Sequence, residues 1–101
     1  MAATVLIVDD EIHIRRLTAQ MLEFAGFEVM EAAGGSQALS LIEETRPDIV
    51  ICDIFMPGMT GLEVLEAIKT DPVTADIPVI MITAIGQEKL ATQATELSTT
   101  K

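Results

Sequence analysis

Residues 4–11 read TVLIVDDE, and residues 47–53 read PDIVICD. In each stretch a short, β-branched and almost wholly apolar run is followed by aspartate. Continuous apolar runs of this length are typical of strands that are buried on both faces of a parallel sheet. They predict strands over residues 4–8 and 47–52, and residues 77–82 form a third run of this kind. The weaker, alternating run over residues 27–31 predicts an edge strand.

Apolar residues at helical spacing follow each of these runs. They are Ile14, Leu17, Met21 and Ala25 after Asp10; Ala38, Leu41 and Ile42 from Ser36; Leu62, Leu65 and Ile68 from Thr60; and Leu90, Ala94 and Leu97 from about Gly86. Strand and helix therefore alternate along the chain. This order predicts the α/β class, with a doubly wound parallel sheet, and it brings the carboxyl ends of the strands to one edge where ligands bind.

Composition restricts the classes of function. A chain of 101 residues is long enough for one domain, here residues 1–101. Its net charge of −10 argues against binding to nucleic acid or to an anionic membrane. One cysteine, Cys52, and no apolar segment long enough to cross a bilayer lead us to expect a cytoplasmic protein.

Three aspartates follow predicted strands: Asp9 and Asp10 come after residues 4–8, and Asp53 comes after residues 47–52. Carboxylates gathered at one sheet edge repel one another unless a cation lies between them, and an all-oxygen ligand set suits Mg²⁺. Asp53, held by a rigid strand, has the chemistry of a nucleophile toward a phosphoryl group, and the Thr83 hydroxyl could bind a phosphoryl oxygen. Taken singly, Asp10 could instead cap a helix, and Asp53 or Thr83 could merely belong to a strand.

Three segments together resemble the receiver domain of two-component response regulators, in the manner of the chemotaxis regulators. They are VLIVDDE at 5–11, DIVICDIFMPGMTG at 48–61 and PVIMITA at 78–84, and the resemblance covers residues 4 to 85. It implies a flavodoxin-like fold and a phosphoacceptor role for Asp53. It further implies Mg²⁺ bound by Asp10, by Asp9 mainly through water, by Asp53 and by the backbone carbonyl of Phe55.

The same resemblance implies how such a domain works. Thr83 would be the switch residue that moves toward the phosphoryl group. The partner would be a sensor histidine kinase or a phosphotransfer protein, and a small phosphodonor could replace it. Receivers are signalling modules rather than enzymes, apart from catalysing their own Mg²⁺-dependent phosphorylation and dephosphorylation.

Residues 86–101 depart from the family pattern, which continues into a fifth strand ending in Lys-Pro and a fifth helix. This segment contains no Lys-Pro pair, so the resemblance is to a C-terminally shortened receiver. Lys101, 18 positions after Thr83, is either the family's phosphate-binding lysine or a solvated chain end. A missing last helix would uncover apolar strand surface, which predicts self-association, domain swapping or a partner that covers it.

Two other functions compete with a phosphoacceptor receiver. A phosphatase with an aspartyl nucleophile needs a second carboxylate two residues after that nucleophile, and Phe55 stands there. A receiver-like fold that binds other proteins without switching is the stronger alternative, because the family lysine is not in its usual motif.

Overall fold

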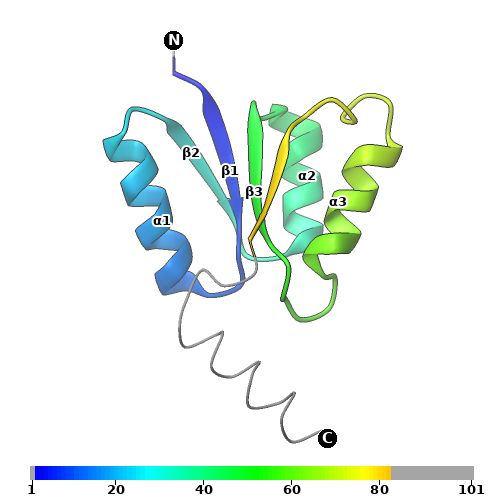
Figure 1. Ribbon diagram of the computed structural model, residues 1–101, viewed down its shortest axis with the longest axis horizontal. Helices are drawn as coiled ribbons and strands as arrows, with labels where there is room; N and C mark the ends of the chain where they lie inside the picture. Colours follow the sequence, from blue (N-terminus) through cyan, green and yellow to red (C-terminus); the bar gives the residue numbers. More distant parts are fainter. Residues whose placement is uncertain (1, 83–101) are drawn as a thin grey trace, which may run out of the picture.

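Strands and helices alternate throughout residues 2–82, the part of the chain described by the computed structural model (Figure 1). The strands are β1 (Thr4–Val8), β2 (Glu28–Ala32), β3 (Ile49–Asp53) and β4 (Val79–Ile82). The helices are α1 (Ile12–Phe24), α2 (Gly35–Thr45) and α3 (Gly61–Thr70). All four predicted strands and the first three predicted helices are confirmed, with ends that shift by one or two residues. The predicted helix from Gly86 lies outside the described residues.

The four strands form one parallel sheet in the order β2-β1-β3-β4. The chain passes from β1 to β2 on one side and then crosses to β3 on the other, so the strand order reverses between β1 and β3. This is the doubly wound, flavodoxin-like arrangement that was predicted, with the weak strand β2 at an edge. In such sheets, the point where the order reverses is where ligands bind.

Helices cover the two faces of the sheet unequally. Figure 1 shows α2 and α3 side by side on one face and α1 on the other. The larger core lies beneath α2 and α3 and contains Leu6, Val8, Ala32, Ala38, Ile42, Val50, Cys52, Met56, Val64, Ile68 and Ile77. Among residues 2–82, the fully buried members of the smaller core beneath α1 are Val5, Ile7 and Ala19. Within the described part of the chain, no helix is long and apolar enough to cross a membrane.

The side of α1 that faces the sheet differs from the prediction. Leu17 and Met21, expected in the buried stripe, are 55% and 64% exposed. Ala19 is buried instead, and Leu22 packs beside it against the smaller core. The helix carries two apolar stripes with similar spacing, so periodicity does not distinguish between them. The small Ala19 side chain allows the helix to lie close to the sheet. The stripe that contains Ala19 and Leu22 therefore faces the sheet.

Within residues 2–82, part of the apolar strand surface on the α1 face of the sheet is exposed. Among residues 2–82, α1 is the helix on this face, and it packs on β1 and β2. Ile80 of β4 pairs in register with Ile51 of β3 and is 46% exposed. Self-association, domain swapping or a partner that covers this surface stay predictions.

Candidate functional site

Three carboxylates meet at the carboxyl edge of the sheet. Asp9 and Asp10 are the two residues that follow β1, and Asp53 is the last residue of β3. One carboxylate oxygen from each can be chosen so that all three lie within 4.8 Å of one another. Asp9 and Asp53 are fully buried, whereas Asp10 is exposed. The structure therefore brings together the three predicted aspartates at the point where the strand order reverses, and we call them the acidic cluster.

Backbone hydrogen bonds hold Asp9 in line with the sheet. Its N–H donates to the carbonyl of Ala32 at 3.1 Å, so pairing with β2 continues one residue beyond Val8. Its Oδ1 accepts a hydrogen bond from the N–H of Glu11 at 2.9 Å. Because one oxygen is engaged in this way, the carboxylate has a fixed orientation.

The cap of α1 settles the alternative interpretation of Asp10. The N-cap residue is Glu11, whose Oε1 accepts a hydrogen bond from the N–H of His13 at 2.7 Å. Asp10 precedes the cap and is not part of it. The interpretation of Asp10 as the helix cap is therefore wrong.

Pairing with β4 and a local hydrogen bond fix Asp53 at the end of β3. Cys52 and Asp53 pair with Met81 and Ile82 of β4, and the N–H of Ile54 donates to the carbonyl of Ile82 at 3.0 Å. The N–H of Phe55 lies 3.3 Å from Asp53 Oδ1 and donates to it. A nucleophile at this position is presented by a rigid strand end, which limits its freedom before any reaction.

Helix α3 begins directly behind Asp53. Thr60 and Glu63 form a capping box, in which Glu63 N–H donates to Thr60 Oγ1 at 3.3 Å and Thr60 N–H donates to Glu63 Oε1 at 2.8 Å. The N–H of Gly61 donates to the carbonyl of Ile54 at 2.9 Å. A Cβ added to Gly61 would lie 2.1 Å from the carbonyl oxygen of Asp53. Only glycine allows α3 to approach the strand so closely.

The acidic cluster has the donor set of a hard divalent cation. Two carboxylate charges 4.8 Å apart repel by about 3 kcal/mol at an effective dielectric constant of 20, and solvent screens the exposed Asp10 further. A cation among the three would replace this repulsion by attraction. Mg²⁺ binds oxygen ligands and keeps several waters, so two buried carboxylates and one exposed carboxylate fit it.

Burial and charge act together on Cys52, which precedes Asp53. Desolvation, followed by the nearby charges of Asp53 and Asp9, raises the pKa of the Cys52 thiol from 9.0 to about 12. The side chain is fully buried. Because the thiolate is the reactive form, Cys52 is an inert packing residue in the folded protein.

The raised pKa of Cys52 predicts a loss of stability at alkaline pH. The thiol ionises more readily in the unfolded chain, so the folded state binds more protons above pH 9 and its free energy of unfolding falls. The contribution of this group is at most about 1.4 kcal/mol per pH unit between the two pKa values. Urea unfolding of wild type and Cys52→Ala from pH 8 to 11 measures this contribution to the free energy of unfolding. The stability difference between them should narrow as pH rises, and a constant difference would contradict the assignment.

Two predicted site residues, Thr83 and Lys101, lie outside the described residues. Phe55 is described: it follows the acidic cluster on the loop after β3, and its side chain is 43% exposed. His13 is exposed on the first turn of α1.

One group near the acidic cluster was missed from sequence. The sequence patterns assigned no role to Arg15, yet its side chain is only 12% exposed and its Nη1 donates to the backbone carbonyl of Asp9 at 2.8 Å. It also pairs with Glu31 near the end of β2. A signal was present, because an arginine in the first turns of a helix and an acid near the end of the neighbouring strand come together in this topology.

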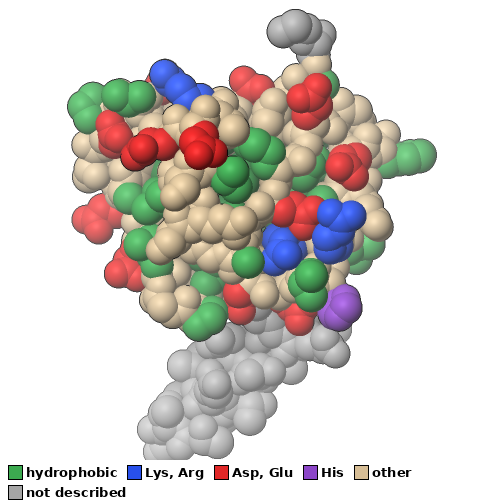
Figure 2. All heavy atoms as spheres, turned by 180° about the vertical axis from the view of Figure 1, so that it is seen from behind, with side chains coloured by type: hydrophobic (Ala, Val, Ile, Leu, Met, Phe, Trp, Pro, Cys, Tyr) green, Lys and Arg blue, Asp and Glu red, His purple; other side chains and the backbone are tan. Residues whose placement is uncertain are grey.

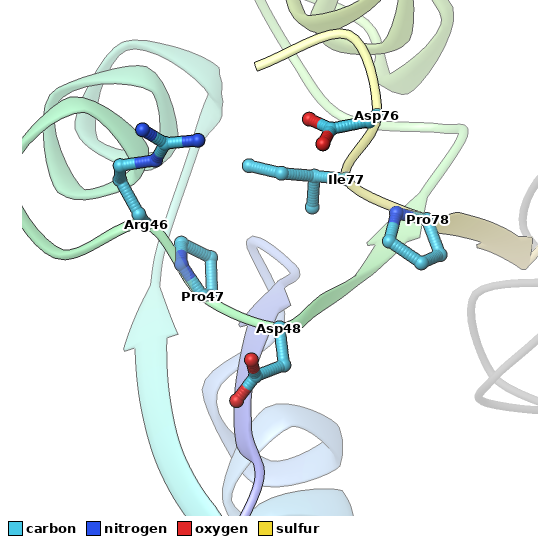
Figure 3. Close-up of a pocket in the computed structure, with 6 residues that line it drawn as sticks. All are labelled: Arg46, Pro47, Asp48, Asp76, Ile77 and Pro78. Atoms are coloured by element: carbon cyan, nitrogen blue, oxygen red, sulfur yellow. The ribbon is translucent and has the colours of Figure 1, made fainter. Parts of the chain in front are cut away.

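A shallow pocket lies at the opposite edge of the sheet. Its volume is about 230 Å³, and its lining residues are Arg46, Pro47, Asp48, Asp76, Ile77 and Pro78. Figure 3 shows the side chains of Arg46 and Asp76 pointing toward one another across it. Arg46 already donates to the carbonyl of Val73 at 3.0 Å, and Asp48 accepts from the N–H of Thr4 at 2.7 Å. These contacts serve the packing of the loops.

A doubly wound sheet with an acidic cluster at its strand-order reversal, two of whose three carboxylates are buried, defines a class of α/β domain that could hold a cation there. Residues 5–101 match the model of the response regulator receiver domain family. The chain belongs to this family, the receiver domains of two-component signal transduction.

Relatives and solved structures support the assignment. The chain is 44% identical over 94 residues to the phosphate regulon transcriptional regulatory protein PhoB of Pseudomonas aeruginosa, covering 93% of this chain and 41% of the relative. It spans about two fifths of the length of the curated PhoB relatives it matches.

Two solved structures show the same fold. One is the N-terminal domain of a response regulator receiver protein from Methanoculleus marisnigri, with 45% identity and a TM-score of 0.81 over 83% of this chain and 68% of that one. The other is the chemotaxis response regulator CheY4 of Vibrio cholerae, with 40% identity and a TM-score of 0.77 over 80% and 68%.

Proposed function

We propose that the chain is a phosphoacceptor receiver that takes a phosphoryl group on Asp53. The observation that carries the proposal is the burial of Asp53 at a strand end, with carboxylate oxygens of Asp9 and Asp10 within 4.8 Å. Two further carboxylates beside a buried acid add charge repulsion and would not be needed for structure alone. A nucleophile that must accept a phosphoryl dianion, in contrast, needs neighbouring residues that bind a cation. Membership of the receiver family supports the same role.

In the proposed reaction, a carboxylate oxygen of Asp53 attacks phosphorus. An O–P bond forms as the bond from phosphorus to its donor breaks. The donor is the phosphorylated histidine of a sensor kinase or phosphotransfer protein, whose imidazole leaves and takes up a proton, or acetyl phosphate, which releases acetate. We place both chain and kinase in the cytoplasm.

The residues around Asp53 would position the reacting groups. Asp9 and Asp10 would hold Mg²⁺ together with Asp53 and the backbone carbonyl of Phe55, and bound Mg²⁺ supplies neutralisation of the charge on the transferring oxygens. The hydrogen bond from Phe55 N–H to Asp53 Oδ1 would orient the nucleophile. Thr83 would bind a phosphoryl oxygen and act as the switch, and Lys101 is a candidate second contact.

Incubation with acetyl phosphate and Mg²⁺, followed by intact-mass measurement, tests the proposal. Wild type should gain one phosphoryl group, and Asp53→Asn should gain none. Asp76→Asn is the matched control, because Asp76 is an exposed acid at the opposite edge of the sheet and its loss should leave the adduct unchanged.

Each other outcome identifies a competing function. Folded wild type that gains no adduct would be a non-switching interaction module. Steady hydrolysis of added phosphate esters would indicate a phosphatase, contrary to the apolar residue at position 55.

A further inference from the structure

Arg15 of α1 joins three parts of the fold beside the acidic cluster. Its Nη1 donates to the backbone carbonyl of Asp9 at 2.8 Å, and its Nε donates to Glu31 Oε1 at 3.0 Å. The two side chains are only 12% and 19% exposed. Arg16 binds the other oxygen of Glu31 from an exposed position. On the side of the molecule that α1 occupies, Figure 2 shows basic side chains gathered around acidic ones.

The contact with Asp9 matters because of the peptide it restrains. The carbonyl oxygen of Asp9 belongs to the peptide bond that links Asp9 to Asp10. On the other side, the N–H of Asp9 is held by the carbonyl of Ala32 at 3.1 Å. Both peptide planes that flank Asp9 are therefore fixed, one by the sheet and one by Arg15. The direction in which the chain leaves toward the exposed Asp10 depends on the second of these contacts.

The guanidinium group also brings positive charge to an acidic neighbourhood. A hydrogen bond from a charged donor to a carbonyl is stronger than a neutral one, and it gains further where solvent is partly excluded. Glu31 keeps the guanidinium in place by accepting from a different nitrogen. Two acceptors in different directions suit the planar fork of arginine and not the single ammonium group of lysine.

We infer that Arg15 is a positioning residue for the metal-binding acidic pair, with Glu31 as its anchor. It sets the peptide between Asp9 and Asp10 so that both carboxylates can reach one cation. This inference rests on the proposed function, since it concerns the Mg²⁺ site of the same cluster. Groups that orient metal ligands from behind typically affect metal affinity about 10-fold or more when removed.

Isothermal titration of Mg²⁺ into the intact chain provides the test. Arg15→Met should weaken Mg²⁺ binding about 10-fold. Arg16→Met is the matched control, because Arg16 pairs with the same glutamate and, among residues 2–82, bonds only to it. It should change the affinity by less than about twofold. Arg15→Lys and Glu31→Gln preserve polar side chains and provide the test if Arg15→Met fails to fold. Each should weaken Mg²⁺ binding by less than Arg15→Met does.

A purely structural role would lower stability without changing the site. Urea unfolding in EDTA, with circular dichroism as the signal, measures the stability of each variant, and the amide NMR signal of Asp10 reports on the peptide itself. We expect that signal to move in Arg15→Met and to stay in Arg16→Met. Equal Mg²⁺ affinity of folded Arg15→Met and wild type would overturn the inference alone. Wild type that binds no Mg²⁺ would overturn the proposed metal site and, with it, the inference.

Discussion

Gly61→Ala should lower the free energy of unfolding by about 3 kcal/mol or more and should slow phosphorylation of Asp53. The added Cβ would lie 2.1 Å from the carbonyl oxygen of Asp53, 2.9 Å from its carbonyl carbon and 2.8 Å from Cα of Ile54. All three atoms belong to the backbone, so no side chain can rotate to make room. Either α3 must move away from the sheet or the end of β3 must shift.

Each of these movements affects the site. Displacing α3 breaks the 2.9 Å hydrogen bond from Gly61 N–H to the carbonyl of Ile54 and strains the capping box at Thr60. Displacing β3 instead moves Asp53 itself, away from Asp9 and Asp10. Phosphorylation requires a near-attack geometry, which an error of about 1 Å is enough to disturb.

Gly34→Ala is the matched control for Gly61→Ala. Gly34 is the N-cap of α2 with an extended backbone, and a Cβ there would meet nothing within 4 Å. Its replacement should cost about 1 kcal/mol or less, through the weaker capping preference of alanine. Urea unfolding by circular dichroism compares the two variants, since the chain has no Trp or Tyr to report by fluorescence. Equal free energies of unfolding for Gly61→Ala and Gly34→Ala would show that α3 can move away from the sheet at no cost. Glycine would then not be required at position 61.

The sequence was sufficient to predict the sheet, because its signals are local. Apolar runs ending in aspartate marked β1 and β3, and strand alternation with helices then placed Asp9, Asp10 and Asp53 at one edge without further information. The weak alternation of residues 27–31 correctly marked an edge strand. These features depend only on neighbouring residues and on the handedness of the chain crossovers.

The missed features depend on contacts between distant segments. Whether Leu17 or Ala19 of α1 faces the sheet is decided by how closely the helix can lie, which spacing does not reveal. The contacts of Arg15 with Glu31 and with the carbonyl of Asp9 join segments that are far apart in the sequence. The steric need for glycine at position 61 likewise arises between α3 and β3, although the family motif includes that glycine.

Asp53→Asn should make the metal-free protein more stable than wild type while removing most of its response to Mg²⁺. The exchange keeps the shape of the side chain and its acceptor for Phe55 N–H, and it removes one of two buried negative charges within 4.8 Å. Their repulsion is about 3 kcal/mol at an effective dielectric constant of 20. We expect a gain of roughly 2 kcal/mol in EDTA, because loss of a carboxylate also weakens its hydrogen bond.

Magnesium should reverse this order of stability. A ligand that binds only the folded state adds about 2.7 kcal/mol at 100 times its dissociation constant, so wild type should overtake the variant as Mg²⁺ rises. The measurement is the free energy of unfolding in urea across a Mg²⁺ series, with NaCl adjusted to hold ionic strength constant. Asp76→Asn, which removes an exposed charge at the opposite edge of the sheet, should track wild type throughout. If Asp53→Asn is the less stable protein in EDTA, the acidic cluster is not under electrostatic strain. Its aspartates would then be structural residues, and the main physical reason for a cation beside Asp53 would be lost.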